Sequence, residues 1–167
     1  MKRNPETLNL AMDYAAALEA AAAYCAVAQP AIRTPEDAAR LMRPIITAAT
    51  SGNAQEAFFV LLLNVKNRPA AAPVECMRGL LDTCPVHPRE VFREAVRNGQ
   101  TASVILCHNQ PTGEATPSKE DLEITRRLID AGRILGIRVT DHVIIGKPDA
   151  NGPGFVSLRE KNLVAFE

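Results

Sequence analysis

"ASVILCHNQPTGEATPSKEDLEITRRLIDAGRILGIRVTDHVIIG", residues 102–146, contains two apolar runs separated by a polar loop and a helical pattern. The first run, 102–107, is short and continuous, which is typical of a buried strand. A helical pattern begins at Ser118 and ends before Gly136, and the run at 137–146 is again interpreted as a strand. Strands and helices alternate, so the stretch predicts an α/β structure built in layers.

The flanking sequence extends this alternation. Thr34, Pro35 and Asp37 mark a helix start, because Thr can cap a helix, Pro fits its first position and Asp can bond back to the cap. We expect further helices at 34–49 and 87–99, and strands at 56–64, 69–77 and 155–158. Two prolines indicate that the strand at 69–77 lies on a sheet edge or is irregular. These elements predict one domain over residues 34–167.

Residues 1–33 are expected to form an N-terminal helical arm, with its helix at 5–27, because alanine is the strongest helix former. Such an arm is suited to packing against the domain or to forming a homodimer. Its basic start resembles a signal peptide, but Asp13 and Glu19 interrupt the apolar stretch. A helix of a soluble protein is therefore preferred.

Composition restricts the class of protein. Apolar residues make up 47% of the 167 residues, which is enough to bury a sizeable core. The formal net charge is zero, which disfavours direct binding to DNA or RNA. No apolar run reaches the ~18 residues of a membrane-spanning helix. The four cysteines form no CxxC pair and indicate free thiols in a reducing compartment, so a cytoplasmic protein is expected.

The loop after residue 107 carries a candidate metal site. His108 and Gln110 point the same way if the strand continues, because strand side chains alternate between faces. Two ligands at this spacing can converge on one ion, and Asp121, in the first turn of the next helix, can supply a third. Three protein ligands and one water make an open, catalytic zinc site, whose water becomes a nucleophile near neutral pH.

A hydrolase also needs a base and an oxyanion donor. Glu56 opens the strand at 56–64 and is the candidate acid/base for the proton of the attacking water. The Ser118 hydroxyl is the candidate donor to a developing oxyanion. The combination of these residues, rather than any one of them, carries the functional interpretation.

The same residues have an ordinary structural interpretation. Ser118 and Asp121 have the form of a capping box, and "TPED" at 34–37 repeats that form without metal-like neighbours. A single histidine such as His108 is more often a hydrogen-bonded residue than a ligand.

Three other residues are candidate substitute ligands. His87 is interpreted as a surface residue and His142 as a buried histidine with a backbone or carboxylate partner. Strand alternation turns Cys107 away from His108, which disfavours its thiolate as a ligand.

The quoted stretch, with "VHPREVFREAV" (86–96) and "EAFFVLLLNVKNR" (56–68), resembles the RadC family of the JAMM or MPN metalloprotease-like superfamily. The superfamily pattern is a Glu, then His-x-His, ten residues and an Asp, with a Ser three before the Asp. The resemblance covers roughly residues 34–164. It implies a cytidine-deaminase-like α/β/α arrangement around a mixed sheet and zinc-dependent hydrolysis of an amide or isopeptide bond in a protein or peptide. The roles that it implies are zinc ligands at His108 and Asp121, an acid/base at Glu56 and oxyanion support from Ser118.

Gln110 departs from this pattern at the second ligand histidine. Zinc binds imidazole nitrogen well, whereas a neutral amide oxygen suits harder cations. We therefore expect zinc to be weakly bound or absent, and favour an impaired or non-catalytic site over a working metallohydrolase. A metal-free module that binds a protein partner and a DNA-repair-associated factor, as the historical family name suggests, are the alternatives.

Overall fold

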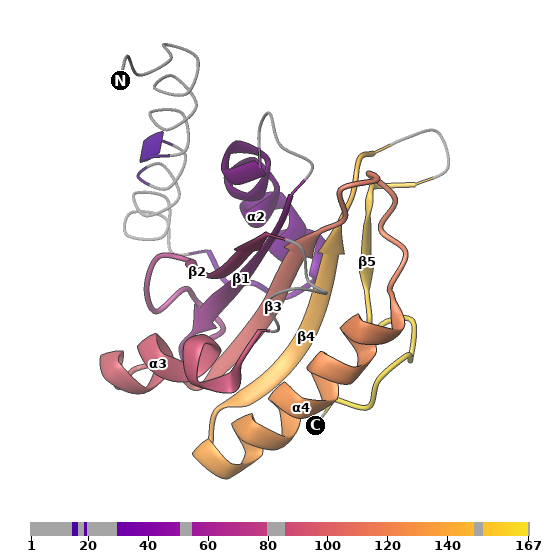
Figure 1. Ribbon diagram of the computed structural model, residues 1–167. Helices are drawn as coiled ribbons and strands as arrows, with labels where there is room; N and C mark the ends of the chain where they lie inside the picture. Colours follow the sequence, from indigo (N-terminus) through magenta and orange to yellow (C-terminus); the bar gives the residue numbers. More distant parts are fainter. Residues whose placement is uncertain are drawn as a thin grey trace, which may run out of the picture.

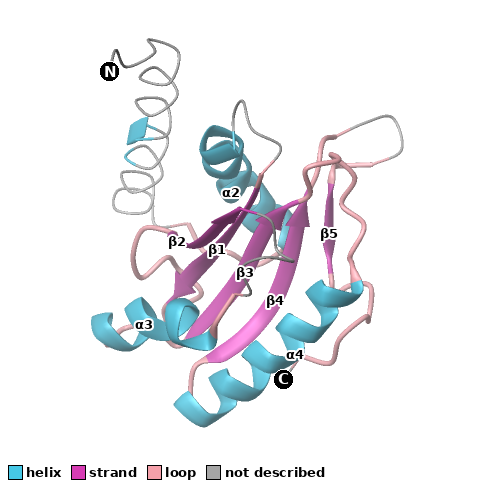
Figure 2. Ribbon diagram, viewed as in Figure 1, coloured by secondary structure: helices cyan, strands magenta, loops and turns pink. Residues whose placement is uncertain are grey.

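A computed structural model describes residues 30–50, 55–79, 86–148 and 152–166, together with residues 15, 16 and 19. In this part of the chain, helices cover both faces of a mixed sheet (Figures 1 and 2). The strands are β1 (Glu56–Leu63), β2 (Val74–Gly79), β3 (Ser103–Asn109), β4 (Arg138–Ile145) and β5 (Phe155–Ser157). The helices are α2 (Pro35–Thr50), α3 (Pro88–Asn98) and α4 (Lys119–Leu135).

The strand order is β2-β1-β3-β4-β5, which places β3 at the centre of the sheet. β3 and β4 are parallel, whereas the other neighbouring strands are antiparallel. A parallel pair needs a crossover connection, and α4 supplies it. The stretch 102–146 therefore forms the only parallel unit of the described sheet, and the predicted α/β class is confirmed.

Three layers arise because the sheet buries both faces. Phe59, Leu61 and Leu63 of β1 pack in the cluster that contains α2, on one face. The alternate residues Phe58 and Val60 pack on the opposite face, with the buried residues of α3 and α4. A strand that is covered on both faces reads as a continuous apolar run. This double burial explains the sequence of β1 and gives the expected α/β/α arrangement.

Capping residues set the helix ends where the sequence predicts them. The Asp37 N–H donates to the Thr34 hydroxyl oxygen at 3.2 Å, and the Thr34 N–H donates to the Asp37 carboxylate at 3.1 Å. Gly136 follows α4 with φ of +70°, a left-handed conformation that favours glycine. These local signals set the start of α2 and the end of α4, the crossover helix.

The strand predicted at 69–77 is shorter and shifted, because β2 begins only at Val74 and ends at Gly79, and an isolated bridge between Leu63 and Pro69 precedes it. Its place at the sheet edge is confirmed. Nearly all of the predicted arm at 1–33, its helix at 5–27 and any homodimer contact lie outside the described residues. Among the described helices, none has the length and apolarity needed to cross a membrane.

We predict that deleting residues 1–28 leaves a cooperative thermal unfolding transition. Among the described residues, the first that is buried is Ile32, whose N–H donates to the Asn67 carbonyl at 2.7 Å. Deleting residues 1–33 removes that contact and should lower the midpoint of thermal unfolding. Calorimetry of the two deletion variants provides the matched comparison. Loss of the cooperative transition in the shorter deletion would show that the arm belongs to the folded core.

Candidate functional site

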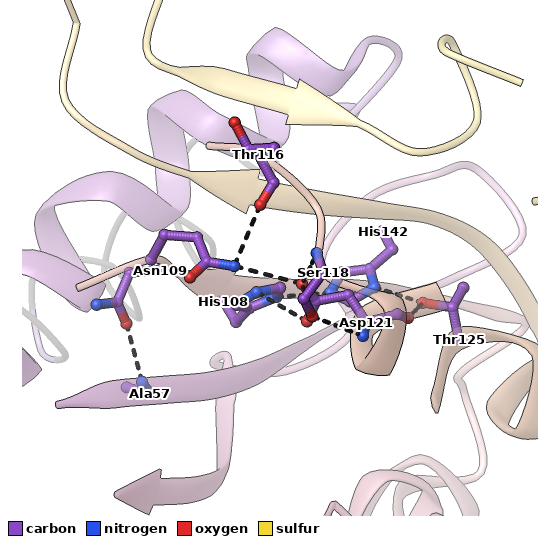
Figure 3. Close-up of polar contacts among 9 residues, drawn as sticks. Ala57, His108, Asn109, Thr116, Ser118, Asp121, Thr125 and His142 are labelled. Atoms are coloured by element: carbon purple, nitrogen blue, oxygen red, sulfur yellow. Dashed lines mark hydrogen bonds and ion pairs between the residues drawn. The ribbon is translucent and has the colours of Figure 1, made fainter. Parts of the chain in front are cut away.

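Polar side chains gather where β3 ends and α4 begins. Figure 3 shows His108, Ser118 and Asp121 pointing toward one another from β3, from the loop that follows it and from the first turn of α4. The Gln110 backbone N–H donates to the Ile145 carbonyl of β4 at 3.2 Å, which holds the start of the loop against the sheet. The crossover therefore brings residues ten or more positions apart into one cluster.

The contact between His108 and Asp121 lies at the centre of this cluster. His108 Nε2 is 3.2 Å from Asp121 Oδ1, and both side chains are 0% exposed. The two atoms lack the alignment of a hydrogen bond, and neither has another hydrogen-bond partner among the described residues. Two buried polar atoms that face each other in this way require a positive charge between them, either a proton or a cation.

The other carboxylate oxygen of Asp121 is well supplied with donors. Oδ2 accepts hydrogen bonds from the Ser118 N–H and the Ser118 hydroxyl, both at 2.8 Å, and from the Gln110 amide at 3.3 Å. Burial alone raises the pKa of Asp121. The nearby charge of His108 and the hydrogen bonds from Ser118 outweigh burial and lower this pKa below its ordinary value. Asp121 is therefore a carboxylate at neutral pH.

Ser118 is both a helix cap and a neighbour of the site. Its hydroxyl oxygen accepts the Asp121 N–H at 3.0 Å while Asp121 accepts the Ser118 N–H, which completes a capping box at the start of α4. The capping interpretation is thus confirmed. The cap also directs Asp121 toward His108. The capping interpretation and the site interpretation are therefore compatible.

Gln110 faces the site as a donor. Its amide nitrogen bonds Asp121 Oδ2 at 3.3 Å and the Thr116 carbonyl at 3.4 Å. Both partners are acceptors, so the NH₂ group, and not the amide oxygen, must point toward them. In this arrangement the side chain at position 110 stabilises the carboxylate and offers no lone pair to a metal ion.

Glu56 lies on the same face of the sheet as His108. Phe58 pairs with His108 across β1 and β3, and directly opposed residues share a face. Glu56 precedes Phe58 by two residues and so has the same orientation. If the antiparallel pairing of Phe58 with His108 is continued by two residues, Glu56 lies opposite Gln110. The sheet thus brings the candidate base to the end where the site lies.

Sequence reasoning did not anticipate the partners of His142. Its Nε2 is 2.8 Å from His108 Nδ1, and its Nδ1 is 2.6 Å from the Thr125 hydroxyl. The predicted burial of His142 is confirmed, but its partners are a hydroxyl and a second imidazole instead of a backbone group or carboxylate. The sequence feature that could have indicated this contact is Thr125, which follows Asp121 by one helical turn and is buried.

The other candidate substitute ligands have different places. His87 caps α3, where its Nδ1 accepts the Arg89 N–H at 3.2 Å, and its side chain is exposed. Cys107 packs in the cluster beneath α2, on the face opposite to Phe58 and His108. Burial, with a smaller contribution from Asp141, raises the pKa of its thiol. The position of Cys107 confirms that strand alternation turns it away.

A metal ion at this site would bind the two unpartnered atoms, His108 Nε2 and Asp121 Oδ1. An open zinc site needs a third protein ligand, and Gln110 presents N–H groups there. Across the described ranges, no three His, Cys, Asp or Glu side chains are arranged to hold a metal ion. The residues present therefore do not fit a complete zinc site.

Comparison with known proteins agrees with the fold. The family model of the RadC-like JAB domain matches residues 32–163. These residues contain strands β1 to β5 and helices α2, α3 and α4, and both sides of the candidate site. The chain belongs to the RadC-like JAB domain family.

Curated relatives carry the name UPF0758 protein. One from Caldanaerobacter subterraneus is 45% identical over 136 residues, which is 81% of this chain and 54% of the relative. One from Symbiobacterium thermophilum is 50% identical over 110 residues, or 65% of this chain and 44% of the relative. A relative from Clostridium botulinum is 44% identical over 133 residues, or 80% and 53%. The chain spans about half the length of these relatives.

We predict that the metal-free protein loses stability as the pH falls from about 7.5 to about 5.5. Burial lowers the pKa of His142 well below its usual value, the charge of His108 lowers it further, and Asp121 opposes the shift only in part. The unfolded chain protonates this residue near pH ~6.5 whereas the folded chain holds it neutral, so the unfolded state gains protons first. The free energy of unfolding should fall by up to ~1.4 kcal/mol per pH unit.

Urea denaturation at several pH values, in the presence of a chelator, measures this dependence. His142→Gln should flatten the curve in this range, whereas the matched change His87→Gln should leave its slope unchanged. An unchanged slope in His142→Gln would contradict the assignment of the effect to the buried imidazole.

Proposed function

We propose that this chain is a RadC-like JAB domain with an impaired metal site. Its architecture is that of a zinc-dependent amide or isopeptide hydrolase. With Gln110 in place of a ligand histidine, it binds zinc weakly and is at most weakly active. The substrate or partner that we propose is a protein or peptide.

The hydrogen bonding of Gln110 carries this proposal. Its amide N–H groups bond Asp121 and the Thr116 carbonyl. To ligate a cation, the side chain would have to break both bonds and turn its oxygen inward. Even then it would offer an amide oxygen, which is a poorer zinc ligand than imidazole nitrogen. Loss of an outer partner of a ligand typically costs ~10–100-fold in affinity, and loss of a ligand itself should cost at least as much.

Access to the site supports the same conclusion. His108 and Asp121 are 0% exposed. A hydrolytic site must admit water and the scissile bond. The closed arrangement therefore corresponds to a resting site, and substrate binding would first have to displace the loop that Gln110 holds.

The region beside Gln110 supports a peptide as the ligand. A cavity of about 320 Å³ is bordered by Gln110 and Asn109 of this sheet end, by Ile46 of α2 and by Lys147 after β4. A space of this size, with apolar and polar walls, is suited to one or two side chains of an extended peptide. Binding of a protein partner without hydrolysis remains the alternative, and association with DNA repair stays a prediction without support from charge.

We predict that Gln110→His binds zinc at least ~10-fold more tightly than the wild type, because it restores the third nitrogen or carboxylate ligand of an open site. Position 110 already faces Asp121, so the imidazole needs no change of backbone. Adding Asp121→Ala should abolish the gain. Zinc titration with a competing chelator measures the three affinities, and cleavage of an isopeptide-linked model substrate by the zinc-loaded Gln110→His protein measures activity.

Gln100→His is the matched control, because Gln100 is exposed and precedes β3 at the opposite end of the strand. This variant should bind zinc no better than the wild type. Tight, stoichiometric zinc in the wild type would overturn the proposal that Gln110 impairs the site. No gain in Gln110→His would remove the metal-site interpretation altogether.

A further inference from the structure

β5 ends the described sheet, and its register with β4 shows which of its backbone groups point away from the sheet (Figure 1). The Gly146 N–H donates to the Gly154 carbonyl at 2.8 Å, and the Leu158 N–H donates to the His142 carbonyl at 3.0 Å. Hydrogen-bonded and non-hydrogen-bonded pairs alternate along an antiparallel ladder. The residues of this segment that bond to β4 are therefore 154, 156 and 158.

Phe155 and Ser157 lie between these positions, so their backbone N–H and C=O groups point outward from the edge of the sheet. The Ser157 carbonyl accepts the Lys161 N–H at 3.1 Å. The Phe155 N–H, the Phe155 carbonyl and the Ser157 N–H remain directed toward a partner. An outward row of this kind is a template on which an extended peptide can add a strand.

Side chains from the rest of the fold hold β5 in place, although it has only three residues. At its start, the Arg43 guanidinium of α2 donates to the carbonyls of Pro153 at 2.9 Å and Gly154 at 3.1 Å. At its end, the Ser157 hydroxyl donates to the buried Asp141 carboxylate at 2.6 Å. An edge that is already ordered costs less conformational entropy when a peptide pairs with it.

A cavity of about 650 Å³ lies beside this edge. Phe155 and Val156 of β5, Leu163 and the loop at 113–117 all border it, and Figure 1 shows the loop between β3 and α4 descending beside β5. Val156 pairs with Ile144, whose side chain belongs to the face covered by α3 and α4. Side chains of a strand alternate between faces, so every second side chain of an added strand would point toward this cavity.

The lining of the cavity indicates which side chains it can receive. Lys147 and Lys161, both exposed, contribute two positive charges, and Glu114 is the remaining charged residue of the lining. Val156 and Leu163 add an apolar wall, and Leu163 is 40% exposed. A positive, partly apolar surface is complementary to an acidic side chain accompanied by an apolar one.

We propose that the outer edge of β5 and this cavity bind an extended segment of a partner protein that carries an acidic and an apolar side chain two positions apart. The proposal rests on the proposed function in taking a peptide as the ligand, and it requires neither zinc nor cleavage. The peptide lies beside the loop whose Thr116 carbonyl bonds Gln110. A second copy of this chain would instead bring two sets of the same lysines to one interface, which like charges disfavour.

Nuclear magnetic resonance of the ¹⁵N-labelled, chelator-treated full chain tests the proposal. The probe is a short, capped, threonine-rich peptide in which a leucine and an aspartate stand two positions apart. Binding should slow hydrogen exchange at the Phe155 and Ser157 amides, which point outward. The Val156 amide, which points toward β4, is the internal reference.

Modified peptides separate strand pairing from charge. In two versions, alternate backbone nitrogens are methylated in the two possible phases. One version should bind and the other should not, because only one set of N–H groups of an added strand faces β5. Replacing the aspartate by lysine should weaken binding, since the lysine meets Lys147 and Lys161.

Reversing the charge of the cavity provides the matching change in the protein. Lys147→Glu combined with Lys161→Glu should weaken binding of the aspartate peptide by ~10-fold or more, because an exposed ion pair contributes ~1.5–5-fold and repulsion replaces two of them. Lys66→Glu combined with Arg138→Glu is the control. It changes the net charge equally at the opposite end of the sheet and should leave the affinity unchanged.

Unchanged exchange at Phe155 and Ser157 with the aspartate peptide would overturn the proposal. Equal binding of the two methylated peptides would overturn it as well, because charge alone would then hold the peptide. Protection of these amides that rises with protein concentration in the absence of peptide would assign the edge to a second copy and reject a peptide partner. Zinc titration of the wild type and Gln110→His decides the proposed function separately, so the two failures are distinguishable.

Discussion

The 3.2 Å contact between His108 Nε2 and Asp121 Oδ1 is the constraint on which the rest of the site depends. Both atoms are buried, and neither has another partner among the described residues. Their surroundings are saturated, since Ser118 and Gln110 occupy the other oxygen of Asp121, and His142 occupies the other nitrogen of His108. One position for a single positive charge remains between two otherwise satisfied side chains. Either a proton or a cation can supply this charge.

The fold creates this contact through its parallel pair of strands. β3 delivers His108 from the centre of the sheet, and the α4 crossover returns Asp121 over the strand end. β4, which is parallel to β3, places His142 beside His108. The cap at Ser118 aims the carboxylate at His108, so the same two residues, Ser118 and Asp121, both start helix α4 and build the candidate site. At the position proposed for a third ligand, Gln110 presents the N–H groups of its amide.

Much of this could be predicted from the sequence because the signals are local. Continuous apolar runs gave β1 and β3, and the Ser118 and Gly136 signals bounded α4. The predicted start of β2 was wrong, because the alanines and prolines at 69–73 do not indicate where strand pairing begins. The partnership of Thr125 with His142 was not foreseen. Those residues lie 17 positions apart on different elements, and their contact depends on how α4 packs against β4. The orientation of a side chain is equally hard to predict from sequence. The sequence places Gln110 near the site but does not show which end of its amide points toward Asp121.

Zinc content of the protein, purified without chelator and measured by mass spectrometry, tests the central claim most directly. The claim is that one imidazole and one carboxylate face each other without a third ligand, so that the site does not retain zinc during purification. The account predicts zinc well below one ion per chain. One tightly held zinc per wild-type chain would contradict it, because the ion would then have to find in Gln110, or in a residue outside the described ranges, the ligand that the site lacks.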